Sequence, residues 1–324
     1  MSDHFLVTGA MGFIGAWVIR NLVREGAQVT AFDLSNNPHR LRLVMSDEEL
    51  QHVRFIAGEG GGDITDTRAV AAVMHDGITH VIHLASLQVP FCKADPVLGA
   101  RVNVVGTVNI FEGAKAAGIK HITYASSIAV FGGSEEYGDS PLADDAPLKP
   151  QTLYGVYKQA NEGTARVYWH DEGISSIALR PYTVYGIGRD QGLTSAPTKA
   201  MLAAAQGSGY HIPFGGRSVY QYADDTARLF IRAARTPIQG AEVFNLRGTA
   251  VHMREIVTAI EAAAPEVVGK ITFDEKSLPF PADTDDSRLI ALLGMPGYRP
   301  LDDGVRETVA LFRQALATGR LKPN

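Results

Sequence analysis

Short apolar runs alternate with longer stretches of helical periodicity through the first 180 residues of this 324-residue chain. Each run is nearly continuous in apolar residues, as in a strand buried on both faces, and the stretches between them repeat apolar positions at helical spacing. This alternation predicts an α/β fold in which helices cover both faces of a doubly wound parallel sheet. The predicted strands are FLVTG, QVTAFD, VRFIAG, THVIHLAS, KHITYASS and SSIALRPY, and helices are predicted over 12–26, 96–118 and 152–173.

The pattern changes after about Pro181, where glycine, proline and aromatic residues become frequent. We therefore expect residues 1–180 to form the main sheet domain, with later segments interlaced, and residues 181–324 to form mainly a smaller substrate-binding lobe. Helices are predicted near 196–207, 224–235, 252–264 and at the C-terminal end, and short strands near 242–246 and 270–273.

Composition narrows the classes of function. Thirty Lys and Arg residues against 35 Asp and Glu give a net charge of −5, and no basic run appears, which argues against a nucleic-acid partner. Cys92 is the only cysteine, so an intrachain disulfide is impossible, and no Cys, His and carboxylate group has the spacing of a metal site. No apolar stretch is long enough for a membrane span and no signal-peptide pattern opens the chain, so we expect a cytoplasmic protein.

Three glycines, Gly9, Gly12 and Gly15, lie between the first strand and the first helix. Gly9 can adopt a positive φ at the turn, a backbone without Cβ lets a pyrophosphate approach, and the helix N-terminus attracts its charge. The spacing differs from G-x-G-x-x-G, and by itself it fits a simple turn as well as a nucleotide site. Its place between strand and helix favours a dinucleotide cofactor.

Asp33 ends the second predicted strand. A carboxylate at this point can accept hydrogen bonds from ribose hydroxyls and would repel a 2′-phosphate, so NAD is favoured over NADP. His39, Arg40 and Arg42 follow closely and leave the use of NADP open. We therefore expect residues 1–180 to form a Rossmann-type domain that binds NAD.

Tyr154 and Lys158 lie one turn apart in a predicted helix and so share a face. A free tyrosine has a pKa of about 10, which a neighbouring ammonium would lower, so that Tyr154 can accept the proton of a substrate hydroxyl while hydride leaves the adjoining carbon. A solvent-exposed pair is the alternative, and Tyr157 is the competing tyrosine. At the end of the fifth strand, Ser126 or Ser127 can bind the same substrate oxygen or simply cap the strand.

Seven motifs occur in this order: TGAMGFIG (8–15), GDI (62–64), HLAS (83–86), NVVGTVNIFEGAK (103–115), SSIAVFG (126–132), YGVYKQANE (154–162) and RPYTVYG (180–186). Together they resemble the extended short-chain dehydrogenase/reductases, the NAD-dependent epimerase/dehydratase-like group. The resemblance spans nearly the whole chain, and the glycine spacing of that family is GxxGxxG.

The resemblance implies roles for individual residues. It implies a catalytic group of Ser127, Tyr154 and Lys158, with Ser127 chosen over Ser126, and an architectural role for Asn103. It also implies a homodimer that pairs the two long helices, roughly 95–117 and 152–172, into a four-helix bundle. The residues implied to bind NAD are Gly9, Met11, Gly12, Phe13, Ile14, Gly15, Asp33, Asp63, Ile64, Leu84, Ala85, Ser86, Tyr154 and Lys158.

Departures from the family pattern bear on the reaction. Ile128 and Ala129 replace the acid pair that the family's dehydratases carry after the catalytic hydroxyl, which argues against dehydration. Arg217 lies one residue away from the position of a diphosphate-binding arginine, and Tyr182-Thr183 replaces a usual Phe-Asn. A diphosphate without cations or donors would be poorly bound, so a smaller polar substrate is favoured.

We therefore expect an NAD-dependent oxidoreductase, with Tyr154 as base, that oxidises a hydroxyl of a small polar substrate: a sugar, a sugar acid or a related hydroxy compound. An epimerase of sugars or nucleotide sugars that keeps its NAD would use the same residues and is the alternative. The intact catalytic group argues against a non-enzymatic cofactor sensor, and His83 is expected to be a hydrogen-bonded core histidine. The expected substrate contacts are Ser86, Gln88, Ser127, Tyr182, Thr183 and Arg217.

Overall fold

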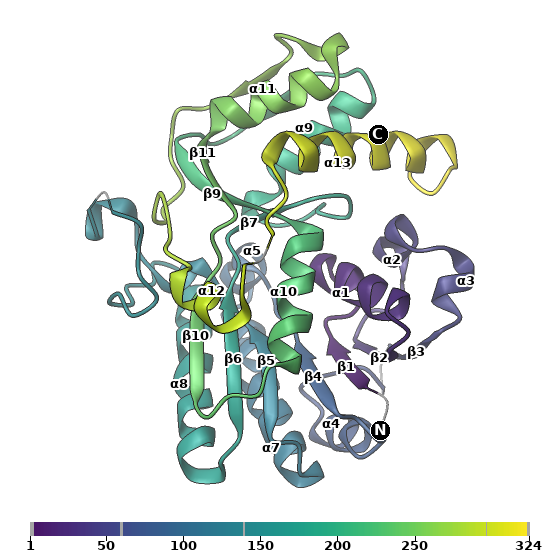
Figure 1. The fold of residues 1–324 in the computed structure, drawn as a ribbon, viewed down its shortest axis with the longest axis vertical. Coiled ribbons are helices and arrows are strands. Elements are labelled where there is room, and N and C mark those ends of the chain that lie inside the picture. Colours follow the sequence, from purple (N-terminus) through teal and green to yellow (C-terminus); the bar gives the residue numbers. More distant parts are fainter. Residues whose placement is uncertain (1–2, 59–60, 139, 296, 323–324) are drawn as a thin grey trace.

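Parallel strands form the central sheet of the structure, a computed structural model that describes residues 3–58, 61–138, 140–295 and 297–322 (Figure 1). The strands are β1 (His4–Thr8), β2 (Gln28–Asp33), β3 (Val53–Ala57), β4 (His80–His83), β5 (His121–Ala125), β6 (Ser175–Arg180) and β10 (Ala241–Asn245). They lie in the order β10-β6-β5-β4-β1-β2-β3, and every neighbouring pair is parallel. The expected doubly wound fold is therefore confirmed, and the strand order changes direction at β1.

Helices cover both faces of this sheet. They are α1 (Phe13–Arg24), α2 (His39–Val44), α4 (Thr67–Met74), α7 (Gly106–Ala117), α8 (Leu153–Glu172) and α10 (Ala223–Arg235). On one face α1 packs against α10 and α2, and on the other α7 packs against α4 and α8 (Figure 1). Each face buries its own hydrophobic cluster, with Trp17 and Phe230 in the first and Val70 and Phe111 in the second. Burial of both faces explains why the strands are nearly continuous apolar runs.

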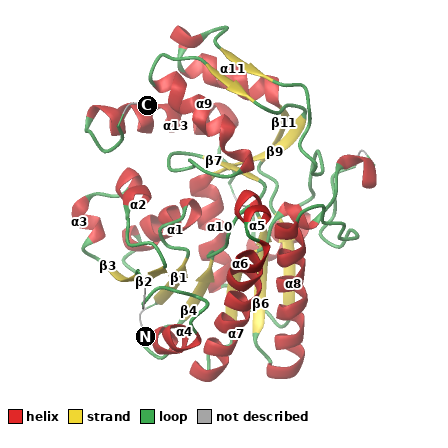
Figure 2. Cartoon of the chain, turned by 180° about the vertical axis from the view of Figure 1, so that it is seen from behind, coloured by secondary structure: helices red, strands yellow, loops and turns green. Residues whose placement is uncertain are grey.

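The chain beyond residue 180 builds a smaller lobe next to the sheet (Figure 2). Its elements are β7 (Thr183–Tyr185), β8 (Tyr210–Ile212), β9 (Arg217–Tyr222), β11 (Thr249–His252), β12 (Ile271–Phe273), α9 (Ala196–Ala205), α11 (Met253–Ala263) and α13 (Leu301–Ala317). Strands β11, β9 and β7 form one sheet, β12 pairs with β8, and both α9 and α11 pack on α13. Since β10 and α10 return to the central sheet, the lobe is interlaced with the first domain, and a boundary at residue 180 stays a prediction.

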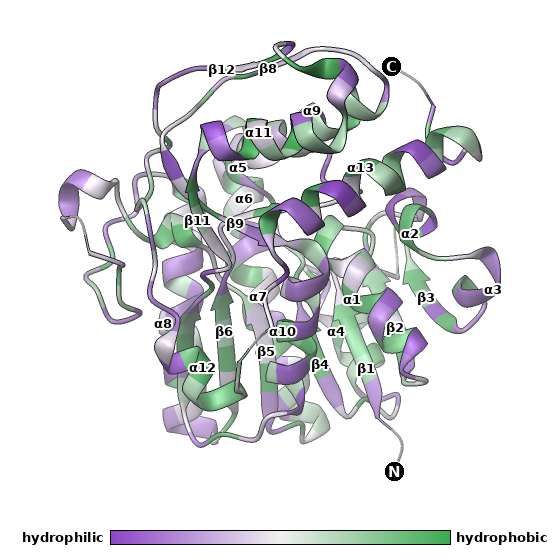
Figure 3. Ribbon diagram, turned by 45° about the horizontal axis from the view of Figure 1, so that its top comes forward, coloured by the Kyte–Doolittle hydropathy of each residue, from purple (hydrophilic) through white to green (hydrophobic). Residues whose placement is uncertain are grey.

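Hydropathy follows this architecture. The strands of the central sheet are mostly hydrophobic, whereas α3, at the periphery, is hydrophilic (Figure 3). Among the described residues, no helix combines the length and the apolar character that a membrane crossing requires. The remaining short elements are α3 (Asp47–Leu50), α5 (Val89–Ala94), α6 (Pro96–Ala100), α12 (Ser287–Leu293), the π-helical turn η1 (Arg101–Val105) and the 3-10 turns η2 (Ile128–Val130), η3 (Ser134–Glu136), η4 (Leu193–Ser195) and η5 (Pro265–Val267).

The helix predicted over 96–118 is divided in the structure into α6, the π-turn η1 and α7. The π-turn carries Asn103, whose side chain holds the backbone of Leu87 on both sides: its amide donates to Leu87 O over 2.9 Å and its oxygen accepts from Leu87 N over 2.7 Å. π-turns occur frequently at functional sites because they displace a side chain from the regular helical path. Apolar periodicity predicts only the helix, not this local change of pitch.

Candidate active site

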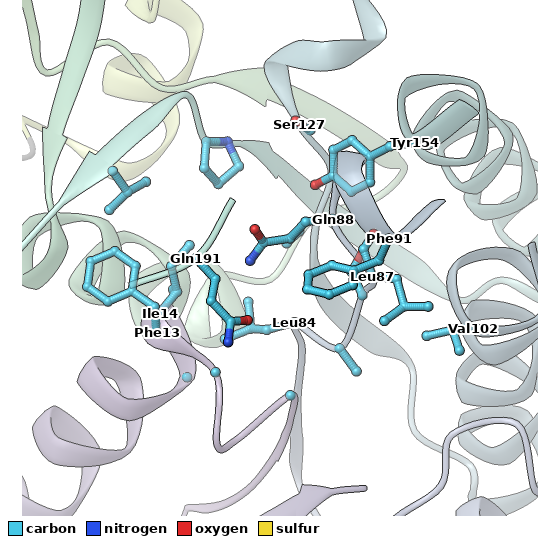
Figure 4. A pocket seen from close by; sticks show the side chains of 18 of the residues that line it. Phe13, Ile14, Leu84, Leu87, Gln88, Phe91, Val102, Ser127, Tyr154 and Gln191 are labelled. Carbon is cyan, nitrogen blue, oxygen red and sulfur yellow. The ribbon is translucent and has the colours of Figure 1, made fainter. Parts of the chain in front are cut away.

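A cavity of about 510 Å³ opens where the carboxyl ends of β1, β4 and β5 meet the smaller lobe (Figure 4). Such a position, beside the reversal of strand order, is the usual ligand site of doubly wound sheets. The predicted site residues that line it are Gly9, Met11, Gly12, Phe13, Ile14, Gly15, Asp33, Asp63, Ile64, Leu84, Ala85, Ser86, Gln88, Ser127, Tyr154, Lys158 and Tyr182. Folding thus gathers residues that are far apart in the sequence.

Two predicted substrate contacts, Thr183 and Arg217, do not line this cavity. Thr183 is fully buried in β7. Arg217 begins β9 with half of its side chain exposed, and its guanidinium lies 3.5 Å from Asp283, which also binds Arg247. The structure therefore does not bring these two residues to the other predicted contacts, because one is part of the core and the other faces a carboxylate at the surface.

The glycine loop has the shape that a dinucleotide needs. Gly9 has φ +67°, and a Cβ on it would lie only 2.6 Å from the backbone nitrogen of Ala85. Gly15 is packed against the carbonyl of Gly9, so that a side chain there would separate α1 from the loop. Gly12 is the N-cap of α1 and brings no side chain to the first N–H groups, which remain available to an anion. These features fit a bound pyrophosphate.

Asp33 holds the start of this loop in place. Its carboxylate accepts hydrogen bonds from the N–H groups of Met11 and Ser35, each over 2.8 Å. Burial raises the pKa of Asp33, while the two N–H bonds and the charge of Arg40 oppose that rise. Arg40 itself donates to Met11 O over 3.0 Å and to Asp190 over 2.7 Å. Arg40, the cation whose charge acts on Asp33, is thus already engaged by the protein.

The two adjacent serines have different partners. Ser126 donates to the buried carboxylate of Glu162 over 2.5 Å, and Glu162 also pairs with Arg180 over 2.8 Å. Ser127 caps η2 by accepting a hydrogen bond from Ala129 N over 3.2 Å, and its side chain lies beside Tyr154 in the cavity (Figure 4). Both serines line the cavity, but the Ser126 hydroxyl is engaged by Glu162, whereas the Ser127 hydroxyl is next to Tyr154.

Tyr154 and Lys158 lie on one face of α8, as their spacing predicts. The ammonium of Lys158 donates to the carbonyl of Ala125 over 2.7 Å and lies 5.6 Å from the centre of the Tyr154 ring. Burial lowers the pKa of Lys158 to about 8. The competing Tyr157 instead donates to Pro96 O over 2.9 Å at the protein surface.

The protonation of Tyr154 differs from the expectation. Burial raises the pKa of this phenol above its usual value, while hydrogen bonding with Ser127, the charge of Arg189 and a weaker bond with Ser86 oppose the rise. Lys158 was expected to lower this pKa, but the cation that does so in the structure is Arg189. The reason is geometric, because the ammonium of Lys158 is turned to Ala125 O.

His83 has the structural role expected of it. Its two ring nitrogens are hydrogen-bonded to Thr8 Oγ1 at 2.7 Å and to Thr107 Oγ1 at 3.1 Å. Complete burial lowers the pKa of His83 to about 3, so the ring is neutral at physiological pH. In the part of the chain that the structure describes, no group of His, Cys, Asp and Glu side chains has the arrangement of a metal site.

Sequence reasoning missed one segment of the cavity wall. Arg189, Gln191 and Leu193 line the cavity from the loop after β7, and Leu87 and Phe91 line it from the other side. Gln88, Phe91 and Gln191 all project into the cavity (Figure 4). The signal in the sequence was GIGRDQG, where glycines bracket a charged pair soon after the sixth strand.

Comparison with known proteins identifies the family. The chain belongs to the NAD dependent epimerase/dehydratase family, whose model matches residues 5–246. UDP-glucose 4-epimerase from Mycolicibacterium smegmatis is 30% identical over 323 residues, which cover 95% of this chain and 98% of that protein. The resemblance and the NAD cofactor expected from the sequence are thereby confirmed at the level of the family.

Solved structures share the fold. UDP-glucose 4-epimerase from Thermus thermophilus, in complex with NAD, is 25% identical with a TM-score of 0.78, and the match covers 97% of this chain and all of that one. A partial-consensus L-threonine 3-dehydrogenase has a TM-score of 0.83 at 24% identity, covering 96% of this chain and all of that one. The second likeness shows a common fold only.

Proposed function

We propose that this protein is an NAD-dependent dehydrogenase that oxidises a hydroxyl group of a small polar substrate. The observation that carries the proposal is the position of Tyr154 next to Ser127 on a cavity that the glycine loop also lines. The family membership supports the cofactor, and the loop around Gly9 has the shape for its pyrophosphate. The substrate and the direction of transfer belong to the proposal alone.

In this proposal each side chain has a separate task. The hydroxyl of Ser127 orients the substrate oxygen, and Tyr154 accepts the proton that leaves this oxygen. Lys158 binds the ribose next to the nicotinamide and supplies positive charge to the site. NAD, when bound, accepts the hydride from the carbon. The glycine loop binds the pyrophosphate, and Asp33 binds the adenosine ribose. Asp63 and Ile64 flank the adenine.

Dehydration is disfavoured by the chemistry of the site. Elimination of water needs an acid to protonate the leaving hydroxyl, and a base to remove the carbon-bound proton. The two residues after Ser127 are Ile128 and Ala129, both almost completely buried in η2. Neither can transfer a proton, so the site supports proton removal by Tyr154 and oxidation by NAD without a following elimination.

An epimerase is the second candidate, because a UDP-glucose 4-epimerase is among the relatives that match nearly the full chain. Such an enzyme would oxidise and then reduce one carbon and would release no NADH. This alternative requires a site for the diphosphate of a nucleotide sugar, and the expected residue for it is misplaced. Arg217, the residue expected to bind it, lies outside the cavity and already contacts Asp283.

The experiment that separates the two candidates measures NADH. Purified protein is incubated with NAD and a panel of sugars, polyols, sugar acids and UDP-sugars, and absorbance at the NADH band is followed together with product analysis. We expect at least one small substrate to give NADH in equal amount to the oxidised product. Conversion of a UDP-sugar to its epimer without NADH would refute the dehydrogenase and establish the epimerase.

A further inference from the structure

Arg189 is a cation of the cavity wall without a counter-ion in the described part of the chain. Its Nη2 donates to Thr194 Oγ1 over 3.1 Å, and its Nε is buried without any hydrogen-bond partner among the described residues. The neighbouring carboxylate of Asp190 is bound by Arg40 over 2.7 Å and by His39 over 3.3 Å. Within the described residues, this partly exposed guanidinium is thus not paired by a carboxylate, and its Nε lacks a partner.

Such a group is costly unless a ligand pairs with it. A buried polar atom without a hydrogen-bond partner, such as Nε here, is unfavourable, and a ligand or a water molecule can supply the missing partner. The guanidinium carbon of Arg189 lies 5.8 Å from the centre of the Phe13 ring, and its charge acts on the phenol of Tyr154. Arg189 therefore lies close enough to Tyr154 to act on its phenol, and it also contacts Phe13 of the glycine loop.

Gln88 presents a second unsatisfied atom beside Arg189. Its Oε1 is buried and lacks a partner among the described residues, and its side chain projects into the cavity near Tyr154 (Figure 4). Gly192, with φ +95°, allows this arrangement: a Cβ there would collide with Gln88 Oε1 and lie 3.2 Å from Arg189 Nη2. A cationic donor and a neutral acceptor are therefore held side by side.

We propose that Arg189 binds a carboxylate of the substrate, and that the substrate is accordingly a hydroxy acid. The planar guanidinium matches a carboxylate with two parallel hydrogen bonds, and Gln88 Oε1 can accept from a neighbouring hydroxyl. The other cations of the described cavity wall are engaged, Arg40 by Asp190 and Lys158 by Ala125 O, so a single available cation favours a singly charged group over a diphosphate. This inference rests on the proposed dehydrogenase, whose substrate class it narrows.

The test is a binding measurement on the NAD-loaded protein. Isothermal titration calorimetry measures the affinities for two acids, D-gluconate and D-glycerate. These are compared with the affinities for the neutral D-glucitol and glycerol and for D-glucose 6-phosphate. We expect the carboxylates to bind more tightly than the neutral compounds. Arg189→Gln should lower the affinity for the carboxylates by about tenfold to a hundredfold, as loss of a charged hydrogen bond usually does. Arg189→Lys should keep part of this affinity, and Arg254→Gln, at an exposed arginine outside the cavity, should keep all of it.

Three results would overturn the proposal. In the first, the neutral compounds bind as tightly as the acids. In the second, the phosphate binds through Arg189 more tightly than the carboxylates do. In the third, Arg189→Gln weakens the binding of NAD and leaves the binding of the acids unchanged. The last result would assign Arg189 to the cofactor. Because the titration does not depend on turnover, acids that bind through Arg189 without any NADH formation would refute the dehydrogenase and leave the carboxylate site standing.

Discussion

Tyr154 shows how one residue's surroundings determine what it can do. Two tyrosines lie close together near the start of α8, yet only Tyr154 lines the cavity, while the hydroxyl of Tyr157 is bound to Pro96 O at the surface. Burial disfavours the phenolate of Tyr154, and the opposing groups are the Ser127 hydroxyl and the Arg189 charge. The base proposed for the reaction therefore depends on residues from three separate segments of the chain.

Tyr154→Phe removes the proposed base without changing the size of the ring. We expect the rate of NADH formation with the best substrate of the panel to fall by about 10²- to 10⁴-fold, the usual contribution of a general base. Titration should show that the variant still binds NAD, so that the lost rate reflects the missing base. Tyr157→Phe is the matched control and should retain the rate, and equal losses in both variants would contradict the assignment.

His83 joins three elements of the central domain. It ends β4, and its ring is hydrogen-bonded to Thr8 of β1 and Thr107 of α7. Thr8 Oγ1 also accepts from Ala85 N over 3.3 Å, so the same threonine contacts the turn next to the glycine loop. A neutral imidazole satisfies both threonines, whereas a protonated ring would be a buried charge without a carboxylate partner among the contacts of this ring.

The stability of the fold should therefore decrease in acid through His83. Its pKa is about 3 in the folded state and 6.5 as the ordinary value, so between these values the unfolded chain binds a proton that the folded chain does not. The contribution is complete above about pH 6.5 and declines as the pH falls. We expect His83→Gln to reduce the loss of unfolding free energy between pH 7 and pH 5 by about 2 kcal/mol, measured by urea unfolding. His211→Gln, at an exposed histidine, is the control; the same pH dependence in all three proteins would refute the prediction.

The outer surface of α6, η1 and α8 is unusually apolar for the molecule as a whole. Val97, Val105, Val156 and Val167 are each 44% exposed or more, the highest value being 73% at Val97. These helices lie together on one face of the central sheet (Figure 2). Exposed apolar surface of this kind is typical of a protein interface. We propose that it pairs with the same face of a second copy, as the resemblance to the family implies.

The double variant Val105→Lys/Val167→Lys tests this pairing. Burying two added charges against an apolar face is unfavourable, so we expect a dimer of the unchanged protein to dissociate into monomers at micromolar concentration. Light scattering after size-exclusion chromatography gives the molar mass, and circular dichroism checks the fold. Val268→Lys, at a valine that is 63% exposed in the smaller lobe, should leave the mass unchanged. A monomeric unchanged protein would refute the homodimer.

The sequence by itself determined the sheet domain and the NAD cofactor of the family, and it predicted the residues of a cofactor site. Apolar runs such as QVTAFD predict buried strands because a strand covered on both faces must be apolar, and the spacing of Gly9, Gly12 and Gly15 reflects contacts within one strand, turn and helix. The common face of Tyr154 and Lys158 was equally predictable from the sequence, because the two residues lie one helical turn apart. Each of these predictions rests on short-range geometry.

Only the tertiary structure decided which distant residues complete the site. It placed Arg217 and Thr183 outside the cavity and brought Arg189 into it, beside the predicted contact Gln88, which lies about a hundred residues away in the sequence. It also turned Lys158 to Ala125 O, which leaves Arg189 as the cation that acts on Tyr154. Such contacts depend on how loops pack after the sheet has formed, and local spacing and periodicity carry no information about that packing.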